Sequence, residues 1–209
     1  MKTFSKIFLI IVLIISCSQK FQSEISKNDS IKTEKDSVKI SVSQEDKCLA
    51  EFNNLRNYIY QKKKDSIKKY FIFPIKDTLS TMNLWSLALN DKGNYKVIFT
   101  EKDFDKYFDK LFSLEYVKCL LKVKSEILFE KGEYETPYIS EKIEEDEGAT
   151  EVRTSMHATF NKKTKILSLT IGSEGYNGNE KKWEAGMIQY DFQYDENCNL
   201  KFYRLFIAG

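Results

Sequence analysis

Side chains suited to acid–base chemistry lie in the last third of the chain. Proton transfer needs a carboxylate or histidine base and a hydroxyl donor inside an apolar cavity, where desolvation tunes their pKa values. The candidates are His157, Glu184, Tyr190, Asp191 and Tyr194. His157 lies on the polar face of an alternating segment, which favours a surface position. The two tyrosines lie on an apolar face, which favours core packing with the hydroxyl at the rim. The sequence therefore designates no catalytic residue.

Three other segments have compositions that suggest binding, and each lacks the full pattern. Gly172–Gly178 has a glycine at every third position, but a phosphate-binding loop ends in Lys-Ser/Thr and leads into a helix. Glu141–Glu147 is acidic but lacks the alternating Asp/Asn pattern of a calcium loop. Lys62–Lys64 follows a helical segment, where the helix dipole favours cations. We interpret the first two as exposed loops and the third as a solvated helix end.

The N-terminus has the pattern of an export signal. Lys2 and Lys6 precede the apolar run Ile7–Ile15, which is far shorter than the roughly 20 residues that a membrane-spanning helix needs. Ser16 and Cys17 follow directly. The stretch Ile14-Ile15-Ser16-Cys17 resembles the lipobox of bacterial lipoproteins.

This resemblance implies how the chain is processed and held. The signal, residues 1–16, is cut off before Cys17, whose sulfur receives diacylglycerol and whose new amino group is acylated. Ser18-Gln19 lacks the aspartate that retains such lipoproteins in the inner membrane. The resemblance therefore implies a lipid anchor at Cys17 in the outer membrane, on a face that stays open between periplasm and cell surface.

Charge limits the partners of the mature chain. Removal of the signal takes Lys2, Lys6 and no acid from a chain of net charge +2, which leaves 31 basic and 31 acidic residues. A neutral chain lacks the basic footprint of a nucleic-acid-binding protein. Arg56, Arg153 and Arg204 are its only arginines, the side chain whose rigid fork recognises phosphate. We expect no nucleic-acid partner.

Composition divides the mature chain at about residue 45. Residues 17–45 hold many Ser, Lys, Glu and Asp and few large apolar side chains, so they cannot bury enough surface to fold. We expect a disordered tether that averages roughly 30 Å from end to end and stretches to about 90–100 Å. Residues 46–209 have the size of one domain, and the chain's 15 Phe and 12 Tyr supply rings for its core.

Three cysteines follow the lipidation site. Cys48 and Cys198 could form a disulfide, because export places them in a compartment that permits one. Cys119 lies in an apolar stretch and is expected to be a buried free thiol. The sequence has no CxxC spacing and one histidine, so it designates no metal ligand and no cofactor-binding residue.

The spacing of apolar residues predicts that the first half of the domain is mainly helical. A helix from about Glu45 has one apolar face, formed by Cys48, Phe52, Leu55 and Ile59. Asp65 is expected to cap a short helix over 66–70. Residues 84–90 and 95–100 flank the turn-rich segment 91–94 and are predicted to pair as a hairpin. Thr100 and Asp103 form a variant capping box before a helix over 101–111, and a further helical turn is expected over 114–121.

Alternation of apolar and polar residues predicts an antiparallel meander in the second half. The expected strands are 151–160, 165–171, 183–194 and 200–207. Apolar residues change faces after Phe202, which predicts a bulge in the last strand. Residues 131–150 are expected to be irregular, with an exposed loop at Glu144–Glu147, and residues 172–182 are expected to form a second loop.

This order of elements, together with Tyr70–Pro74 and Phe99–Phe104, resembles the nuclear transport factor 2-like fold over residues 46–209. That fold is α+β, with a curved antiparallel sheet wrapped around helices to form a cone. In the family, the cone binds a small apolar molecule, hosts proton-transfer or dehydration chemistry, or is filled by side chains.

The leading hypothesis is a non-catalytic binding or interaction module on a lipid anchor, whose partner is a small apolar ligand or a protein. The alternatives are a small ketosteroid-isomerase-like or dehydratase-like enzyme and a protective, immunity-type lipoprotein. An enzyme requires a carboxylate or His157 near a tyrosine in an open cavity. A small-molecule binder requires an open cavity, whereas an interaction module requires a filled cavity and an exposed patch.

Lipidation at Cys17 is tested by metabolic labelling. Radiolabelled fatty acid should enter the wild-type chain and be absent from the Cys17→Ser variant, because the acyl chains need the thiol and the amino group released beside it. Equal labelling of the two chains would contradict the lipobox assignment.

Overall fold

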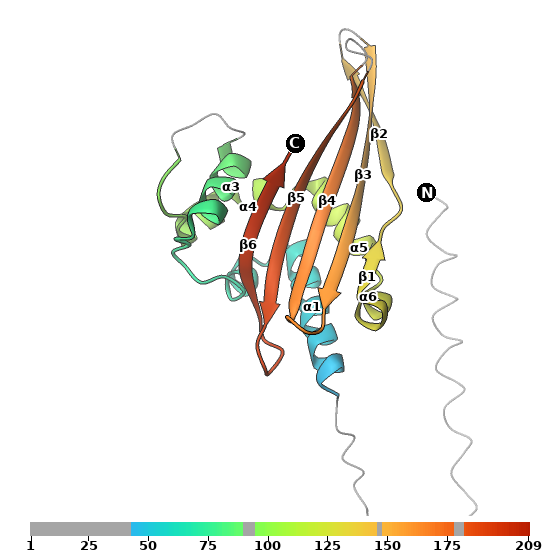
Figure 1. The fold of residues 1–209 in the computed structure, drawn as a ribbon. Helices are drawn as coiled ribbons and strands as arrows, with labels where there is room; N and C mark the ends of the chain where they lie inside the picture. The colour runs from blue at the N-terminus through green and yellow to red at the C-terminus, as the bar shows by residue number, and fades with distance from the viewer. Residues whose placement is uncertain (1–42, 90–94, 146–147, 178–181) are drawn as a thin grey trace, which may run out of the picture. The chain divides into compact units, whose positions relative to one another are not determined.

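Six helices precede an antiparallel sheet in the computed structural model, which describes residues 43–89, 95–145, 148–177 and 182–209 (Figure 1). The helices are α1 (Gln44–Tyr60), α2 (Lys64–Lys68), α3 (Thr78–Leu89), α4 (Glu101–Leu111), α5 (Leu114–Lys122) and α6 (Ser125–Lys131). The strands are β1 (Glu133–Glu135), β2 (Ile139–Glu145), β3 (Gly148–Asn161), β4 (Ile166–Asn177), β5 (Lys182–Tyr194) and β6 (Leu200–Ala208). These elements belong to one compact unit, Ser41–Gly209.

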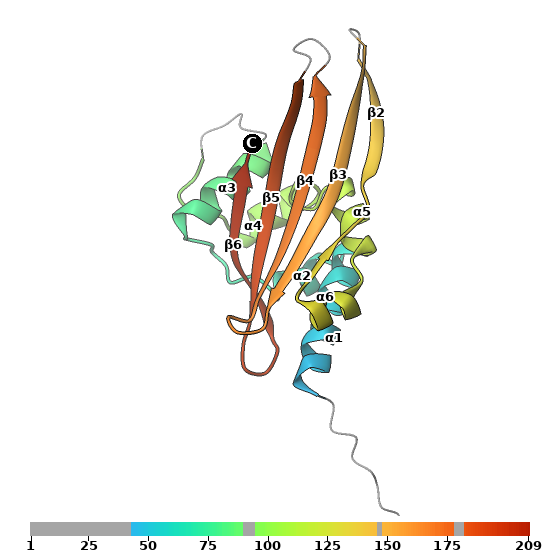
Figure 2. The same cartoon turned by 45° about the vertical axis from the view of Figure 1, so that its right-hand side comes forward.

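The sheet is a meander with two short strands at one edge. Its order is β1-β3-β4-β5-β6, and β2 also pairs with β3. All pairings are antiparallel. The predicted α+β class and antiparallel meander are therefore confirmed. Figure 2 shows α1, α2, α5 and α6 on one side of this open sheet.

The predicted helix faces are confirmed where spacing and capping agree. In α1, the buried residues are the four predicted ones, Cys48, Phe52, Leu55 and Ile59. In α4, the hydroxyl of Thr100 accepts from the backbone N–H of Asp103, and the Asp103 carboxylate accepts from the N–H of Thr100, so the predicted capping box is present. The predicted helical turn after residue 114 is α5.

The predicted hairpin over 84–100 is wrong, because its first half belongs to helix α3. The buried residues of α3 are Ser80, Thr81, Leu84, Trp85 and Ala88, at helical spacing. Apolar residues also occupy much of its outer face, so the hydrophobic pattern gave no clear period from which to distinguish helix from strand. In residues 95–100 the structure has a single bridge, between Phe99 and Ile75. The segment 90–94 lies outside the described residues.

Three predicted irregular or capping features are also wrong. The charged stretch 131–150 contains β1 and β2, which pair with β3; strands at a sheet edge can be charged because water solvates their outer side. The predicted loop 172–182 belongs mostly to β4, which continues to Asn177 and pairs with β5. Helix α2 begins at Lys64 without a side-chain cap, and the Asp65 carboxylate instead pairs with Lys68 at 2.9 Å.

The predicted bulge in the last strand is confirmed. Asp191 is opposite Arg204 and Phe192 is opposite Phe202, so Tyr203 is the extra residue.

The edge of β6 is covered by α3. Asn83 Nδ2 donates to the Leu205 carbonyl at 2.7 Å, and the Leu205 N–H donates to Ser80 Oγ at 3.2 Å. These bonds satisfy backbone groups that an uncovered edge strand would leave unpaired.

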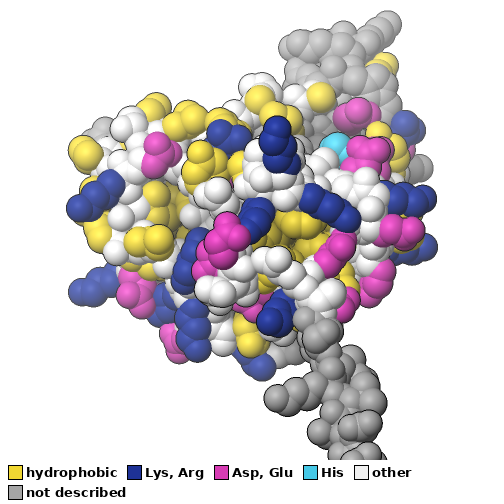
Figure 3. All heavy atoms as spheres, turned by 60° about the horizontal axis from the view of Figure 1, so that its bottom comes forward, with side chains coloured by type: hydrophobic (Ala, Val, Ile, Leu, Met, Phe, Trp, Pro, Cys, Tyr) yellow, Lys and Arg dark blue, Asp and Glu magenta, His cyan; other side chains and the backbone are white. Residues whose placement is uncertain are grey.

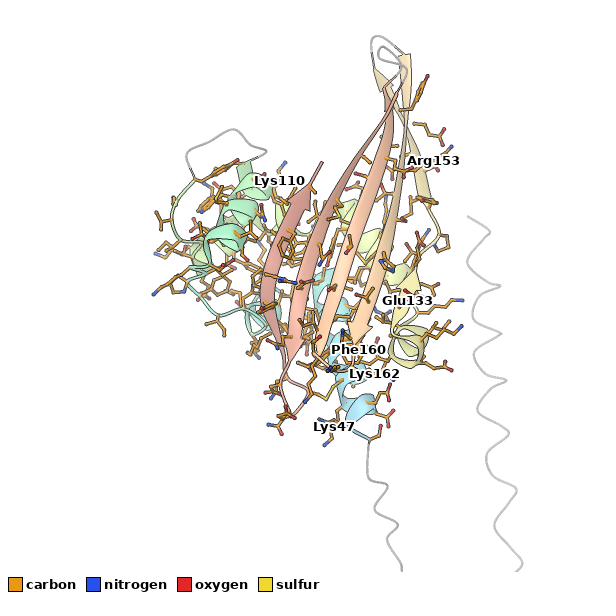
Figure 4. All side chains as sticks on the ribbon, viewed as in Figure 1. Lys47, Lys110, Glu133, Arg153, Phe160 and Lys162 are labelled. Carbon is orange, nitrogen blue, oxygen red and sulfur yellow. A yellow bond between two sulfur atoms is a disulfide. The ribbon has the colours of Figure 1, made fainter. Side chains whose placement is uncertain are left out.

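A disulfide joins α1 to the turn between β5 and β6. Cys48 and Cys198 form this bond across a separation of 150 residues, whereas Cys119 is buried and free, as predicted. Two further contacts hold the first turn of α1 at the same end of the sheet. Gln44 Nε2 donates to the Glu196 carbonyl at 2.8 Å, and Lys162 Nζ pairs with Glu45 at 2.7 Å. Figure 4 shows Lys162 at this end, beside Lys47 on α1.

Loss of the disulfide should lower the free energy of unfolding by about 2–5 kcal/mol, because the bond closes a long loop in the unfolded chain. Urea unfolding of the wild type with and without reductant measures the difference. Cys119→Ala should keep this reductant dependence, and Cys198→Ser should abolish it. Equal midpoints for oxidised and reduced wild type would contradict the expected contribution.

Candidate functional site

The structure places His157 on the sheet face opposite the core. Its side chain is 51% exposed, and Nε2 lies 3.8 Å from a carboxylate oxygen of Glu133 on β1. The register puts His157 opposite Thr170 on β4, in the outward-facing set of side chains. This position agrees with the surface position that its sequence pattern favours.

Tyr190 and Tyr194 are core residues, and the prediction that their hydroxyls lie at the rim is wrong. Both rings are buried. The Tyr190 hydroxyl donates to the Leu111 carbonyl at the end of α4, and the Tyr194 hydroxyl donates to the Cys48 carbonyl in α1 at 2.9 Å. Burial raises the pKa of both phenols well above the usual tyrosine value. The hydroxyls therefore remain protonated and connect the sheet to two helices.

Asp191 faces away from the tyrosines, on the outer side of β5. It is fully buried, and its carboxylate accepts from Arg204 Nε at 2.7 Å and from Gln189 Nε2 at 2.9 Å. The side chain of Glu184 lies outside the described residues. The described candidates His157, Asp191, Tyr190 and Tyr194 are thus divided between the two faces of the sheet, and the structure does not bring them together.

Aromatic rings fill the space between the helices and the inner face of the sheet. Tyr190 lies 5.6 Å from Phe112 and 5.1 Å from Tyr116, measured between ring centroids. Nearby, Phe71 lies 4.9 Å from Phe104. At the other side of the core, Phe129 lies 4.6 Å from Phe160. Contacts at these distances are those of close-packed rings, so this part of the interior is occupied by side chains.

Open apolar space lies farther along the same face, where the strands continue past the helices. β3, β4 and β5 have 14, 12 and 13 residues, whereas α5, which packs on β3 and β4, has 9. A strand advances about 3.3 Å per residue and a helix about 1.5 Å. Helix α5 is therefore too short to cover these strands along their length, and Figure 1 shows the three strands extending beyond the helices.

Two adjoining hollows of about 500 and 450 Å³ form a groove there. Ile188, Ile207 and Ser113 line both hollows. The sheet side of the groove is lined by Val152, Thr154, Ile171, Ser173, Gly186, Met187, Ile188, Ile207, Ala208 and Gly209. The helix side is lined by Ser86, Leu87, Asp109, Lys110, Ser113, Leu114 and Glu115.

The lining of this groove combines apolar side chains with hydroxyls on both sides and with charged groups on its helix side. Ile188 is half-buried and Leu114 is 64% exposed, so apolar side chains face solvent. Alternation along β4 and β5 is enough to predict that Ile171 and Ile188 face inward, on the same side as Leu169 and Tyr190. It could not indicate that these residues lack a helix above them, because coverage depends on the relative lengths of the two layers.

A third hollow, of about 410 Å³, lies at the opposite end of the unit, between α1, the end of α2 and the β5–β6 turn. Its polar groups bind one another. Lys201 Nζ donates to the Lys69 carbonyl, and the Asp195 carboxylate accepts from Asn199 Nδ2 at 2.7 Å. Burial and the nearby Glu51 carboxylate raise the pKa of Tyr70. Figure 3 shows this end, where charged side chains of both signs are interspersed.

The charged motifs of the sequence serve local packing where the structure describes them. Lys62 pairs with Asp109 at 2.6 Å, and Lys64 Nζ donates to the Asp105 carbonyl at 2.7 Å. Glu141 pairs with Lys118 at 2.6 Å; the side chains of 142–147 lie outside the described residues. No group of three or more His, Cys, Asp or Glu side chains in the described part of the chain is arranged to hold a metal ion.

Comparison of the chain with known protein families, curated proteins and solved structures returns no match. Within the described segments, no helix is long and apolar enough to cross a membrane. The function of the chain is therefore inferred from the geometry of the groove and from the sequence of the N-terminus.

Substitution should show that the buried Asp191 contributes more to stability than the exposed His157. Asp191→Ala should lower the free energy of unfolding by about 2 kcal/mol, because it removes charged hydrogen bonds and leaves Arg204 unpaired. His157→Ala should change it by less than about 0.5 kcal/mol, as expected for a surface site. Urea unfolding of the two variants measures both values. Equal effects would contradict the assigned positions.

Proposed function

We propose that this chain is a non-catalytic binding module, held by a lipid anchor, that takes an apolar segment of a partner protein into the groove. Rings fill the helix-covered interior, while the uncovered part of the same sheet face presents an open groove with an apolar base. A filled interior with an exposed apolar surface is the combination expected of an interaction module.

The chemistry of the groove favours a protein segment. Ile188 and Ile207 form an apolar base that can bury side chains. The exposed Ser173 hydroxyl can bond to a peptide backbone, and the Ser113 hydroxyl, which accepts from the Tyr116 N–H, can still donate. The two hollows adjoin, so the groove continues from the α3–α4 side of the unit across β6, β5 and β4 to β3. An elongated groove suits a segment of chain better than a compact ligand.

We infer the location of the module from the pattern of its N-terminus. Cys17, which lies outside the described residues, would carry the proposed acyl chains, and residues 18–43 connect it to α1. We place the unit outside the inner membrane, at the outer membrane. We also retain the nuclear transport factor 2-like cone as the proposed fold relationship, supported by helices that precede and pack against an antiparallel meander.

Two neighbouring residues on opposite faces of β4 allow a matched test. Ser173 lines the groove and Glu174 faces the other way, and both are exposed. Peptides selected from a random display library against the wild type should bind Ser173→Trp at least about tenfold more weakly, a loss of about 1.4 kcal/mol. Glu174→Trp should bind them as the wild type does.

Failure to select any peptide, or equal weakening by both substitutions, would contradict a protein-binding groove. Native mass spectrometry of the purified wild type tests the alternative that the groove binds a small apolar molecule. A co-purified small apolar molecule that is lost in Ser173→Trp would replace the protein segment with a small ligand in the same groove.

A further inference from the structure

Helix α3 has a composition unlike the rest of the chain. Asp, Glu, Lys and Arg make up 31% of the sequence, yet Thr78–Leu89 contains none of them. Its inner side is buried against β6 and α4, with Leu84 and Trp85 almost completely covered. Its outer side is uncharged and includes two exposed apolar side chains, Leu79 at 48% and Met82 at 50%. A surface helix normally carries polar and charged residues on this side.

The segment after α3 adds two exposed apolar side chains beside the helix. Trp85 Nε1 donates to the Ile98 carbonyl at 3.2 Å, which holds residues 97 and 98 beside the helix. Val97 is 87% exposed and Ile98 38%. We call Leu79, Met82, Val97 and Ile98 the α3 surface. In Figure 3, hydrophobic side chains gather at the left, the side on which α3 lies in Figure 1.

Charged groups lie at the border of the α3 surface. Lys76 is exposed just before the helix. Lys96 lies over the Trp85 ring at 4.8 Å and pairs with Asp103 at 3.4 Å. An apolar centre with lysines at its margin suits the boundary between the acyl chains and headgroups of a bilayer. The four residues of the α3 surface do not line the binding groove.

The N-terminal connection keeps this surface close to a membrane. Residues 18–42 separate the proposed lipidated Cys17 from the described unit, and even fully extended they span at most about 90 Å. A unit connected to the bilayer by such a segment meets it at a high effective concentration, so weak apolar contacts suffice for frequent docking. A diffusing protein partner gains no such advantage.

From these observations we infer that the α3 surface docks on the lipid bilayer to which Cys17 is anchored, with Leu79, Met82, Val97 and Ile98 entering the interface. This inference rests on the proposed lipid anchor and is independent of what the groove binds. Docking would restrict the orientations of the unit at the membrane, which a tether alone leaves unrestricted.

A photocrosslinker at Val97 tests the inference directly. The lipidated mature chain is reconstituted in vesicles of phosphatidylethanolamine and phosphatidylglycerol with benzoylphenylalanine in place of Val97. Irradiation should give phospholipid adducts at a yield several-fold above that of the same reporter in place of Tyr60, which is 59% exposed at the end of α1. Adding Leu79→Glu and Met82→Glu should reduce the Val97 yield to the Tyr60 level, because charge opposes entry into the interface.

Charge substitutions at other exposed residues, and a separate measurement of anchoring, serve as controls for this experiment. Tyr60→Glu with Tyr138→Glu adds the same charge at other exposed rings and should leave the Val97 adduct unchanged. Equal adducts at positions 97 and 60, or adducts to a second copy of the chain, would overturn the docking surface while flotation with the vesicles upholds the anchor. A mature chain without fatty acid would overturn both.

Discussion

The packing of rings between the helices and one face of the sheet is the constraint on which the other features depend. Tyr190 occupies its centre, against Phe112 and Tyr116, and its hydroxyl bonds to the last carbonyl of α4. Tyr194 connects β5 to α1 in the same way, next to the disulfide of Cys48. Because these contacts position the helices over only part of the sheet, the remaining apolar face becomes the groove.

In this arrangement, the side chains that could have transferred protons have structural roles. A tyrosine hydroxyl in an apolar interior could donate a proton to a substrate, but Tyr190 and Tyr194 already donate to backbone carbonyls. A buried carboxylate could act as a base, but Asp191 accepts from Arg204 on the other side of the sheet. Binding at the groove needs neither the tyrosine hydroxyls nor the Asp191 carboxylate, since apolar side chains and serine hydroxyls line it.

The parts of the fold that could be predicted are those in which local signals agree. Periodicity and a capping box both indicated α4, and strict alternation indicated β3 and β5. Helix α3 could not be predicted because its outer side is apolar as well, which obscured its period; that same surface is where we infer membrane docking. Strands β1 and β2 were missed because pairing with β3, not their own composition, makes them strands. For the groove, the inward direction of Ile188 was predictable, but its lack of a helical cover was not.

Side chains fill the interior of the unit, and its open apolar space lies in the groove. Titration of the methyl-labelled chain with benzene, followed by NMR, distinguishes the two regions, because benzene enters apolar space of sufficient size. We expect concentration-dependent shifts at the methyls of Ile171, Ile188 and Ile207, with the buried Leu167, Leu169 and Leu205 unaffected. Shifts at the buried leucines with none at the groove isoleucines would contradict this expectation.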